Sequence, residues 1–104
     1  MTTHRVASEN DLAPGSVMRC ELFSRDICLA RTENGEFYAV DDDCPHEEAW
    51  LSEGDLNGFE IECPMHYSRF DLRTGEVRCL PAKRPVETFA TEIREGAVYV
   101  TVPG

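Results

Sequence analysis

Two short segments that pair cysteine with histidine constrain this chain more than any other feature of its sequence. They read Cys44-Pro45-His46 and Cys63-Pro64-Met65-His66, and sixteen residues separate them. The chain has only three histidines, and two of them stand in these segments. Each segment offers one soft thiolate ligand and one imidazole ligand next to a turn-forming proline. The pattern predicts a metal centre held between two loops, so the fold must bring both loops to one place.

Ligation by two cysteines and two histidines leaves two kinds of centre open. A structural zinc ion takes these ligands in a tetrahedral site. A Rieske 2Fe–2S cluster takes them too, with the histidines on one iron and the cysteines on the other. For zinc, each loop would bring its cysteine and its histidine to a single ion. The spacing alone does not choose between the two centres.

Short apolar runs separated by turn signals predict the fold class. The runs cover residues 16–23, 27–30, 37–40, 86–93 and 97–102, and no segment keeps an apolar period of 3.6 over three turns. Asn34-Gly35 and Asn57-Gly58 predict two-residue hairpin turns in which both central residues have positive φ. Thr74-Gly75 and Glu95-Gly96 mark further turns, and residues 8–12 suit one short helical turn. We expect an all-β fold, an antiparallel sandwich or small barrel, in one domain over residues 1–104.

Acidic residues are concentrated between and beside the two segments. The chain has twenty acidic and ten basic residues, and its formal net charge is -10. Nine of the acids stand within residues 41–62, where there is no Lys or Arg. These nine are Asp41, Asp42, Asp43, Glu47, Glu48, Glu53, Asp55, Glu60 and Glu62. The charge argues against nucleic-acid binding, and the acidic stretch is either a solvated face or a docking surface for a basic partner.

The location of the protein is predicted from the apolar runs and the cysteines. No apolar run approaches the roughly 20 residues that span a bilayer, and the N-terminus lacks the apolar core of a secretory signal. The five cysteines are an odd number, which fits a reducing compartment better than a disulfide scaffold. We therefore expect a cytoplasmic protein that does not bind membranes. Cys20, Cys28 and Cys79 are predicted to be buried apolar side chains, and His4 an exposed one.

Further segments accompany the two Cys/His segments along nearly the whole chain, from about Val6 to Val102. They are Leu51-Ser52-Glu53-Gly54, Arg69-Phe70-Asp71, Thr74-Gly75 and Cys79-Leu80-Pro81. With them the chain resembles Rieske-type ferredoxins, the small electron carriers of bacterial aromatic-ring-hydroxylating dioxygenase systems. The resemblance implies a two-loop cluster-binding subdomain, at about residues 43–81, on an antiparallel β-sandwich base.

The resemblance also implies the cofactor and its ligands. One 2Fe–2S cluster is expected, with Cys44 and Cys63 on the buried iron and with His46 and His66 on the iron nearer solvent. Ser68 matches a serine that hydrogen-bonds to sulfur in high-potential relatives. Those relatives also have a tyrosine where Phe70 stands here, and a disulfide across the loops that Met65 cannot form. The expected reduction potential is therefore near the low end of the Rieske range, about -150 mV.

The implied function is one-electron transfer from an NAD(P)H-dependent flavin reductase to a terminal oxygenase. The chain itself is not expected to be an enzyme, since His4 alone would remain for a mononuclear iron site and no Gly-x-Gly-x-x-Gly segment is present. We expect a monomer that docks transiently with both partners. Two alternatives stay open: the small Rieske subunit of another redox enzyme, such as a nitrite reductase, and a zinc-stabilised interaction module.

Four further residues have expected roles near the cluster. Pro81 belongs to a segment that covers the cluster in the family, although a plain turn would also place a proline there. Glu47 and Glu48, beside the ligand His46, are predicted to belong to the partner surface. Trp50 either packs over the cluster loops or stands at the rim of that surface as an aromatic anchor.

Overall fold

The computed structural model of the chain describes residues 1–22, 25–45, 49–65, 68–79 and 84–103. Its elements are strands and two 3-10 turns, which confirms the all-β fold class. In chain order they are β1 (Thr2–Ser8), η1 (Glu9–Asp11), β2 (Ser16–Glu21), β3 (Asp26–Arg31), β4 (Phe37–Asp41), η2 (Leu51–Glu53), β5 (Asp55–Asn57), β6 (Glu60–Glu62), β7 (Arg69–Asp71), β8 (Val77–Cys79), β9 (Thr88–Arg94) and β10 (Ala97–Val102). Within the described part of the chain, no helix is long and apolar enough to cross a membrane.

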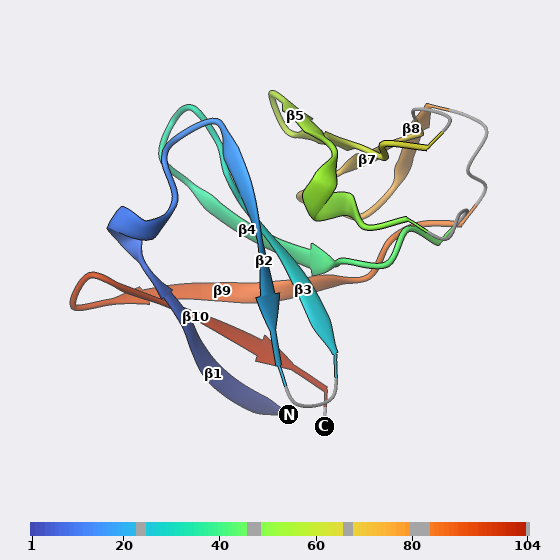
Figure 1. Ribbon diagram of the computed structural model, residues 1–104. Helices are drawn as coiled ribbons and strands as arrows, with labels where there is room; N and C mark the ends of the chain where they lie inside the picture. The colour runs from blue at the N-terminus through green and yellow to red at the C-terminus, as the bar shows by residue number, and fades with distance from the viewer. Residues whose placement is uncertain (23–24, 46–48, 66–67, 80–83, 104) are drawn as a thin grey trace.

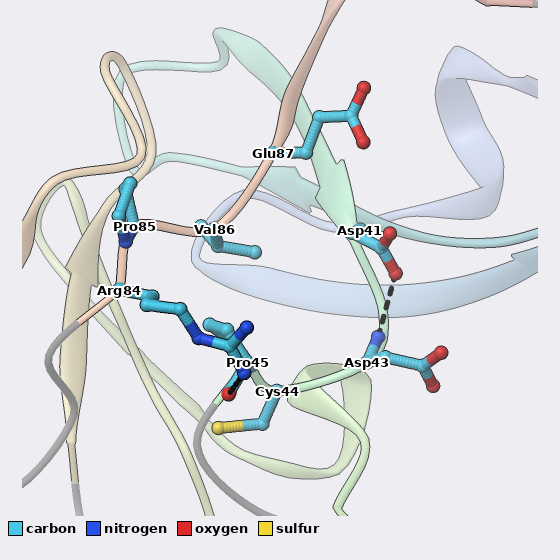
Figure 2. A pocket seen from close by; sticks show the side chains of 8 residues that line it. All are labelled: Asp41, Asp43, Cys44, Pro45, Arg84, Pro85, Val86 and Glu87. Atoms are coloured by element: carbon cyan, nitrogen blue, oxygen red, sulfur yellow. Dashed lines mark hydrogen bonds between the residues drawn. The ribbon is translucent and has the colours of Figure 1, made fainter.

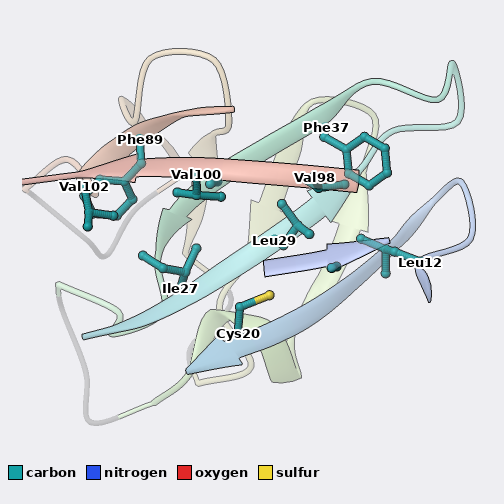
Figure 3. Close-up of a cluster of buried hydrophobic side chains, with 11 residues drawn as sticks. Leu12, Cys20, Ile27, Leu29, Phe37, Phe89, Val98, Val100 and Val102 are labelled. Carbon is teal, nitrogen blue, oxygen red and sulfur yellow. The ribbon is translucent and has the colours of Figure 1, made fainter. Parts of the chain in front are cut away.

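The base of the molecule is a six-stranded antiparallel sheet that folds over on itself. Its strand order is β1-β10-β9-β4-β3-β2 (Figure 1). The two halves join where β4 pairs with β9 over only two residue pairs, Ala39 with Phe89 and Val40 with Thr88. Side chains from both halves meet in one apolar core, as Figure 3 shows. Its largest fully buried members include Ile27 and Leu29 of one half and Val98 and Val100 of the other. The predicted β-sandwich base is confirmed.

A second, four-stranded sheet is inserted in the chain between β4 and β9. It has the order β5-β6-β7-β8 and stands at one end of the base (Figure 1). A second apolar core joins it to the base. The base contributes Cys28, Ala30 and Val40, and the inserted segment contributes Leu51, Ile61, Phe70 and Leu72, which are all at most 1% exposed. The apolar contacts therefore fix the small sheet against the base.

The hairpins form at the predicted places, but two of the predicted turn geometries are wrong. Among the described non-glycine residues only Glu95 has a positive φ, so Asn34 and Asn57 do not. The connection at Asn34 spans the five residues between β3 and β4, with Gly35 at φ 89°. In the β5–β6 hairpin the two loop residues are Gly58 and Phe59 and not the predicted Asn57 and Gly58, because Asn57 still pairs with Glu60. Glu95 and Gly96, at φ 48° and 79°, form the turn with two positive φ values.

Strand β1 was not predicted from the sequence, since its first residues are polar. It lies at the sheet edge and pairs with β10, with a register irregularity between Arg5 and Ala7. His4 belongs to this strand opposite Val100 and is partly buried, so it is less exposed than predicted. Cys20 and Cys28 are buried thiols, 6% and 0% exposed, as predicted. The side chain of Cys79 lies outside the description.

The small sheet contains a buried carboxylate bound by two arginines. Asp71, at the end of β7, is 2% exposed. Arg73 donates to both of its carboxylate oxygens, at 3.1 and 3.0 Å, and Arg78 of β8 donates to Oδ2 at 3.0 Å. The hydrogen bonds from Arg73 are the largest cause that holds the pKa of Asp71 well below its usual range. The hydrogen bonds of Asp71 with Arg73 and Arg78 therefore link β7, the following turn and β8.

We predict that Asp71→Asn destabilises the protein by about 1–3 kcal/mol at pH 7, because two guanidinium groups lose their buried charged acceptor. The pKa of Asp71 is depressed in the folded state, so this stabilisation is present above the unfolded-state pKa of about 3.9 and is lost as the pH falls below it. Urea unfolding of both proteins between pH 7 and pH 3 measures the difference, which should shrink with acid. Glu92→Gln removes a carboxylate from an exposed pair with Arg94 and is the matched control. Equal stability of Asp71→Asn and wild type at pH 7 would contradict the prediction.

Candidate metal centre

Each of the two Cys/His segments is closed by a backbone hydrogen bond, and the two bonds are of the same kind. The N–H of Cys44 donates to the carbonyl of Ala49 at 3.0 Å, and the N–H of Cys63 donates to the carbonyl of Ser68 at 2.7 Å. In both cases the acceptor stands five residues after the cysteine, so each bond closes a loop of four intervening residues. His46 and His66 belong to these loops, but they lie outside the described residues. Glu47, Glu48 and Pro81 also lie outside the described residues. Their predicted roles stay predictions.

Both cysteines of these segments are buried. Cys44 is 5% exposed and Cys63 is 0% exposed, and neither forms a disulfide. The two residues belong to the apolar core that joins the small sheet to the base. Two thiols in one apolar core, each at the root of a short closed loop that carries a histidine, suit the cysteine side of the predicted donor set. No three metal-binding side chains converge among the described residues, from which both loop histidines are missing.

The first loop stands on a stem of paired backbone. The N–H of Leu51 donates to the carbonyl of Asp42 at 2.8 Å, and Asp43 forms an isolated bridge with Trp50. Trp50 is 43% exposed, and the guanidinium of Arg19 lies 4.7 Å from its ring centroid. The ring therefore contacts β2 of the base and keeps an open face at the root of the loop. Its part in partner binding stays a prediction.

A close backbone contact fixes the chain after η2 against the root of the second loop. Gly54 follows η2, and a Cβ added to it would lie 1.8 Å from the carbonyl oxygen of Glu62. Glu62 is the residue before Cys63, so only a glycine lets the chain after η2 approach the root of the second loop this closely. The φ of Gly54 is -89°, so the requirement is one of space and not of backbone conformation.

The residues after the second loop are deeply buried. Ser68 and Phe70 are both 0% exposed, and the carbonyl of Ser68 closes the loop. Phe70 packs in the core beside Cys63 and Leu72, so it brings no hydroxyl to this place. Met65, which precedes His66, is 47% exposed. The predicted tuning role of Ser68 stays a prediction.

A cleft of about 300 Å³ opens beside Cys44. Figure 2 shows the eight side chains around it: Asp41, Asp43, Cys44, Pro45, Arg84, Pro85, Val86 and Glu87. Arg84 donates to the carbonyl of Pro45 at 2.9 Å, which ties the chain after the second loop to the first. Burial is the largest cause that raises the pKa of Asp41. Sequence reasoning missed Arg84 and Glu87, because only the pairing of β4 with the segment leading into β9 brings them here.

The acidic stretch is not one continuous solvated face. Asp42 is completely buried. Glu60 and Glu62 lie on β6 next to Arg69, whose nitrogens are 3.9 and 3.2 Å from their carboxylates. Asp43, by contrast, is exposed at the cleft. Within the acidic stretch, Asp43 therefore brings exposed negative charge to the cleft beside the first loop.

Comparison with known proteins identifies the class of protein. Residues 2–90 match the Rieske [2Fe-2S] domain family. The chain belongs to this family, and its cofactor is one Rieske-type 2Fe–2S cluster. The zinc-centred alternative is thereby set aside. The chain is an electron-transfer protein and not a catalytic subunit.

Its relatives are ferredoxins of aromatic dioxygenase systems. The chain is 39% identical to the ferredoxin component of the p-cumate 2,3-dioxygenase system of Pseudomonas putida, over 93% of this chain and 83% of that protein. It is 36% identical to the ferredoxin component of biphenyl 2,3-dioxygenase of Rhodococcus jostii, over 100% and 96%. A chain in the solved complex of reduced oxygenase and oxidized ferredoxin in carbazole 1,9a-dioxygenase matches with a TM-score of 0.89 and 36% identity, covering 94% of this chain and 91% of that one.

We predict that Gly54→Ala lowers both stability and iron content. The added methyl group meets a backbone carbonyl that cannot turn away, so η2 and β6 must separate, at a cost of about 3 kcal/mol. Thermal unfolding and the ratio of iron to protein measure the two effects. Gly58→Asn is the control in the same sheet, since nothing lies within 4 Å of a Cβ there and asparagine tolerates its φ of +62°. A Gly54→Ala protein with wild-type stability and full iron content would contradict the prediction.

Proposed function

We propose that this chain carries single electrons from an NAD(P)H-dependent flavin reductase to the terminal oxygenase of an aromatic-ring-hydroxylating dioxygenase system. The observation that carries the proposal is the pair of identically closed loops, each rooted on a buried thiol, in a chain whose relatives are ferredoxins of such systems. The carbazole relative was solved in complex with its oxygenase, which supports direct docking of the carrier.

The proposed ligands of the cluster are Cys44, His46, Cys63 and His66. We propose that residues 43–81, within a single domain, form the part of the chain that binds it. When bound, the cluster supplies the one-electron redox couple. The chain holds both thiols in an apolar core, where water is excluded, and each loop uses the N–H of its own cysteine for closure. The loops are thus anchored by backbone bonds that do not depend on the side chains of the ligands.

Substitution of the ligands tests this assignment against the other buried thiols. Cys44→Ser, Cys63→Ser, His46→Ala and His66→Ala should each abolish the visible absorbance of the cluster and the EPR signal of the reduced protein. Cys28→Ala is the matched control, because Cys28 is a completely buried thiol in the same core. It should keep the cluster, with an average g near 1.9 that indicates mixed His/Cys ligation. A colourless wild-type protein that binds one zinc ion would contradict the proposed function.

The reduction potential should be low for a Rieske centre, about -150 mV. Phe70 provides no hydroxyl group, and Met65 cannot take part in a disulfide between the loops. Fewer hydrogen bonds to sulfur leave the reduced state less stabilised. Protein-film voltammetry measures the potential. A value above roughly +100 mV would show that other groups compensate for these differences.

The acidic surface near the first loop is the proposed docking site. It comprises Asp41, Asp43 and Glu87 at the cleft, together with Glu47, Glu48 and Trp50 of the first segment. The charge fits a reductase or an oxygenase with a basic surface, which it would attract from a distance. We propose a cytoplasmic monomer, because transient docking suits a carrier and because the odd number of cysteines, five, fits a reducing compartment better than a disulfide scaffold.

Ionic strength tests the proposed docking surface. Electron-transfer rates with the native partner should fall about tenfold from about 0.01 M to about 1 M salt, over which the Debye length shortens from about 30 to about 3 Å. Asp43→Asn combined with Glu87→Gln should lower the rate at low salt and flatten its salt dependence. Glu92→Gln, on the β9–β10 hairpin, removes one negative charge away from the cleft and should leave the rate unchanged. A rate that does not depend on salt would rule out electrostatic steering.

A further inference from the structure

We propose that Asp42 is a positioning residue of the cluster site, which holds the first ligand loop and, through its buried negative charge, lowers the reduction potential. The proposal rests on the function proposed above. Asp42 stands two residues before Cys44 and is 0% exposed. In the sequence it looks like one member of an acidic run, whereas in the structure it is the only one of the nine acids that is completely buried among those described.

Asp42 joins three parts of the site. Its Oδ1 accepts a hydrogen bond from the N–H of Ser52 at 2.8 Å, and its carbonyl accepts one from Leu51 at 2.8 Å. Its own N–H donates to the carbonyl of Asp26 at 3.1 Å. The first two bonds clamp η2 onto the stem of the loop, and the third fixes the stem to the start of β3. The position of Cys44 therefore depends on contacts made by Asp42.

The charge of Asp42 is only partly compensated. Oδ2 is buried and accepts no hydrogen bond in the described structure. Its cationic neighbour is Arg19, whose Nε lies 3.5 Å away. Arg19 also donates to the carboxylate of Asp26, at 2.6 Å, so one guanidinium serves two carboxylates. Trp50 covers that guanidinium on one side. Because a buried charge is poorly screened, the uncompensated part acts on the neighbouring core.

The field of Asp42 reaches the core that contains the ligand thiols. Burial is the largest cause that raises the pKa of Cys28, and the charge of Asp42 is the next. Cys28 belongs to the same apolar core as Cys44 and Cys63. A carboxylate that opposes a thiolate in this core also opposes the negative charge that a reducing electron adds.

Two substitutions with opposite expected signs test the electrostatic part. Asp42→Asn keeps Oδ1 as the acceptor for Ser52 and removes the charge, so the potential of the cluster-loaded protein should rise. Arg19→Gln removes the counter-charge, so the potential should fall. The EPR g values and the iron content of both variants should match those of the wild type. Glu92→Gln and Arg94→Gln remove the same charges from an exposed pair on β9 and should shift the potential several-fold less.

The positioning part has its own measurement. Asp42→Ala removes the acceptor as well as the charge, so amide hydrogen exchange at Ser52 should become faster and the iron content should fall. Asp42→Asn should leave both nearly unchanged. Unchanged exchange at Ser52 in Asp42→Ala would overturn the positioning role.

The outcomes separate this inference from the proposed function. If the wild type shows no Rieske EPR signal, the proposed function fails. If the signal is present and Asp42→Asn shifts the potential no more than Glu92→Gln does, the electrostatic role of Asp42 fails alone. Should Asp42→Asn not fold, the sign of the shift in Arg19→Gln decides, because an unchanged or higher potential would overturn the electrostatic role.

Discussion

The backbone hydrogen bond from each ligand-segment cysteine to the carbonyl five residues later is the contact on which the site depends. It closes a loop too short for regular structure and directs the cysteine side chain into the core shared by the two sheets. The two loops must also be fixed relative to one another, because the four proposed ligands have to converge. Gly54 meets this need by close approach to Glu62, and Asp42 meets it by clamping η2. The apolar core that contains Phe70 then buries the arrangement against the base.

Ion pairs inside the molecule determine which of its carboxylates are compensated by arginine. Several arginines are engaged by carboxylates around the small sheet: Arg73 and Arg78 with Asp71, and Arg69 with Glu62. These pairs stabilise the small sheet, and Arg69 compensates part of the negative charge of Glu60 and Glu62. The carboxylates at the cleft beside Cys44 lack such described ion pairs, apart from Glu87 with Arg25 at 3.3 Å. Asp41 and Asp43 therefore bring carboxylates without a described ion pair to the cleft beside the first loop.

The sequence predicted the features that depend on rare residues or on short-range pattern. Cysteine and histidine are scarce, so two matched segments predict a metal centre, and the apolar run of β-branched and aromatic residues in Ala97–Val102 predicts a strand that the structure contains. The polar strand β1 could not be predicted, because the apolar face of β10 holds it in place and its own sequence contributes little. The burial of Asp42 was equally hidden, since its neighbours in sequence are solvent-accessible acids. Glu87 reaches the cleft only through long-range pairing of β4.

The place of the insertion in the base puts the cleft beside Cys44 at the point where the chain leaves the base and returns to it. The chain leaves the base after β4 and returns at β9, and the N–H of Asp41 donates to the carbonyl of Glu87 where the two strands meet. Departure and return are therefore joined by a hydrogen bond. The core around Val40 and Leu51 adds a second attachment of the inserted segment to the base. The cleft beside Cys44 opens at this same junction, because Asp41 and Glu87 line it together (Figure 2).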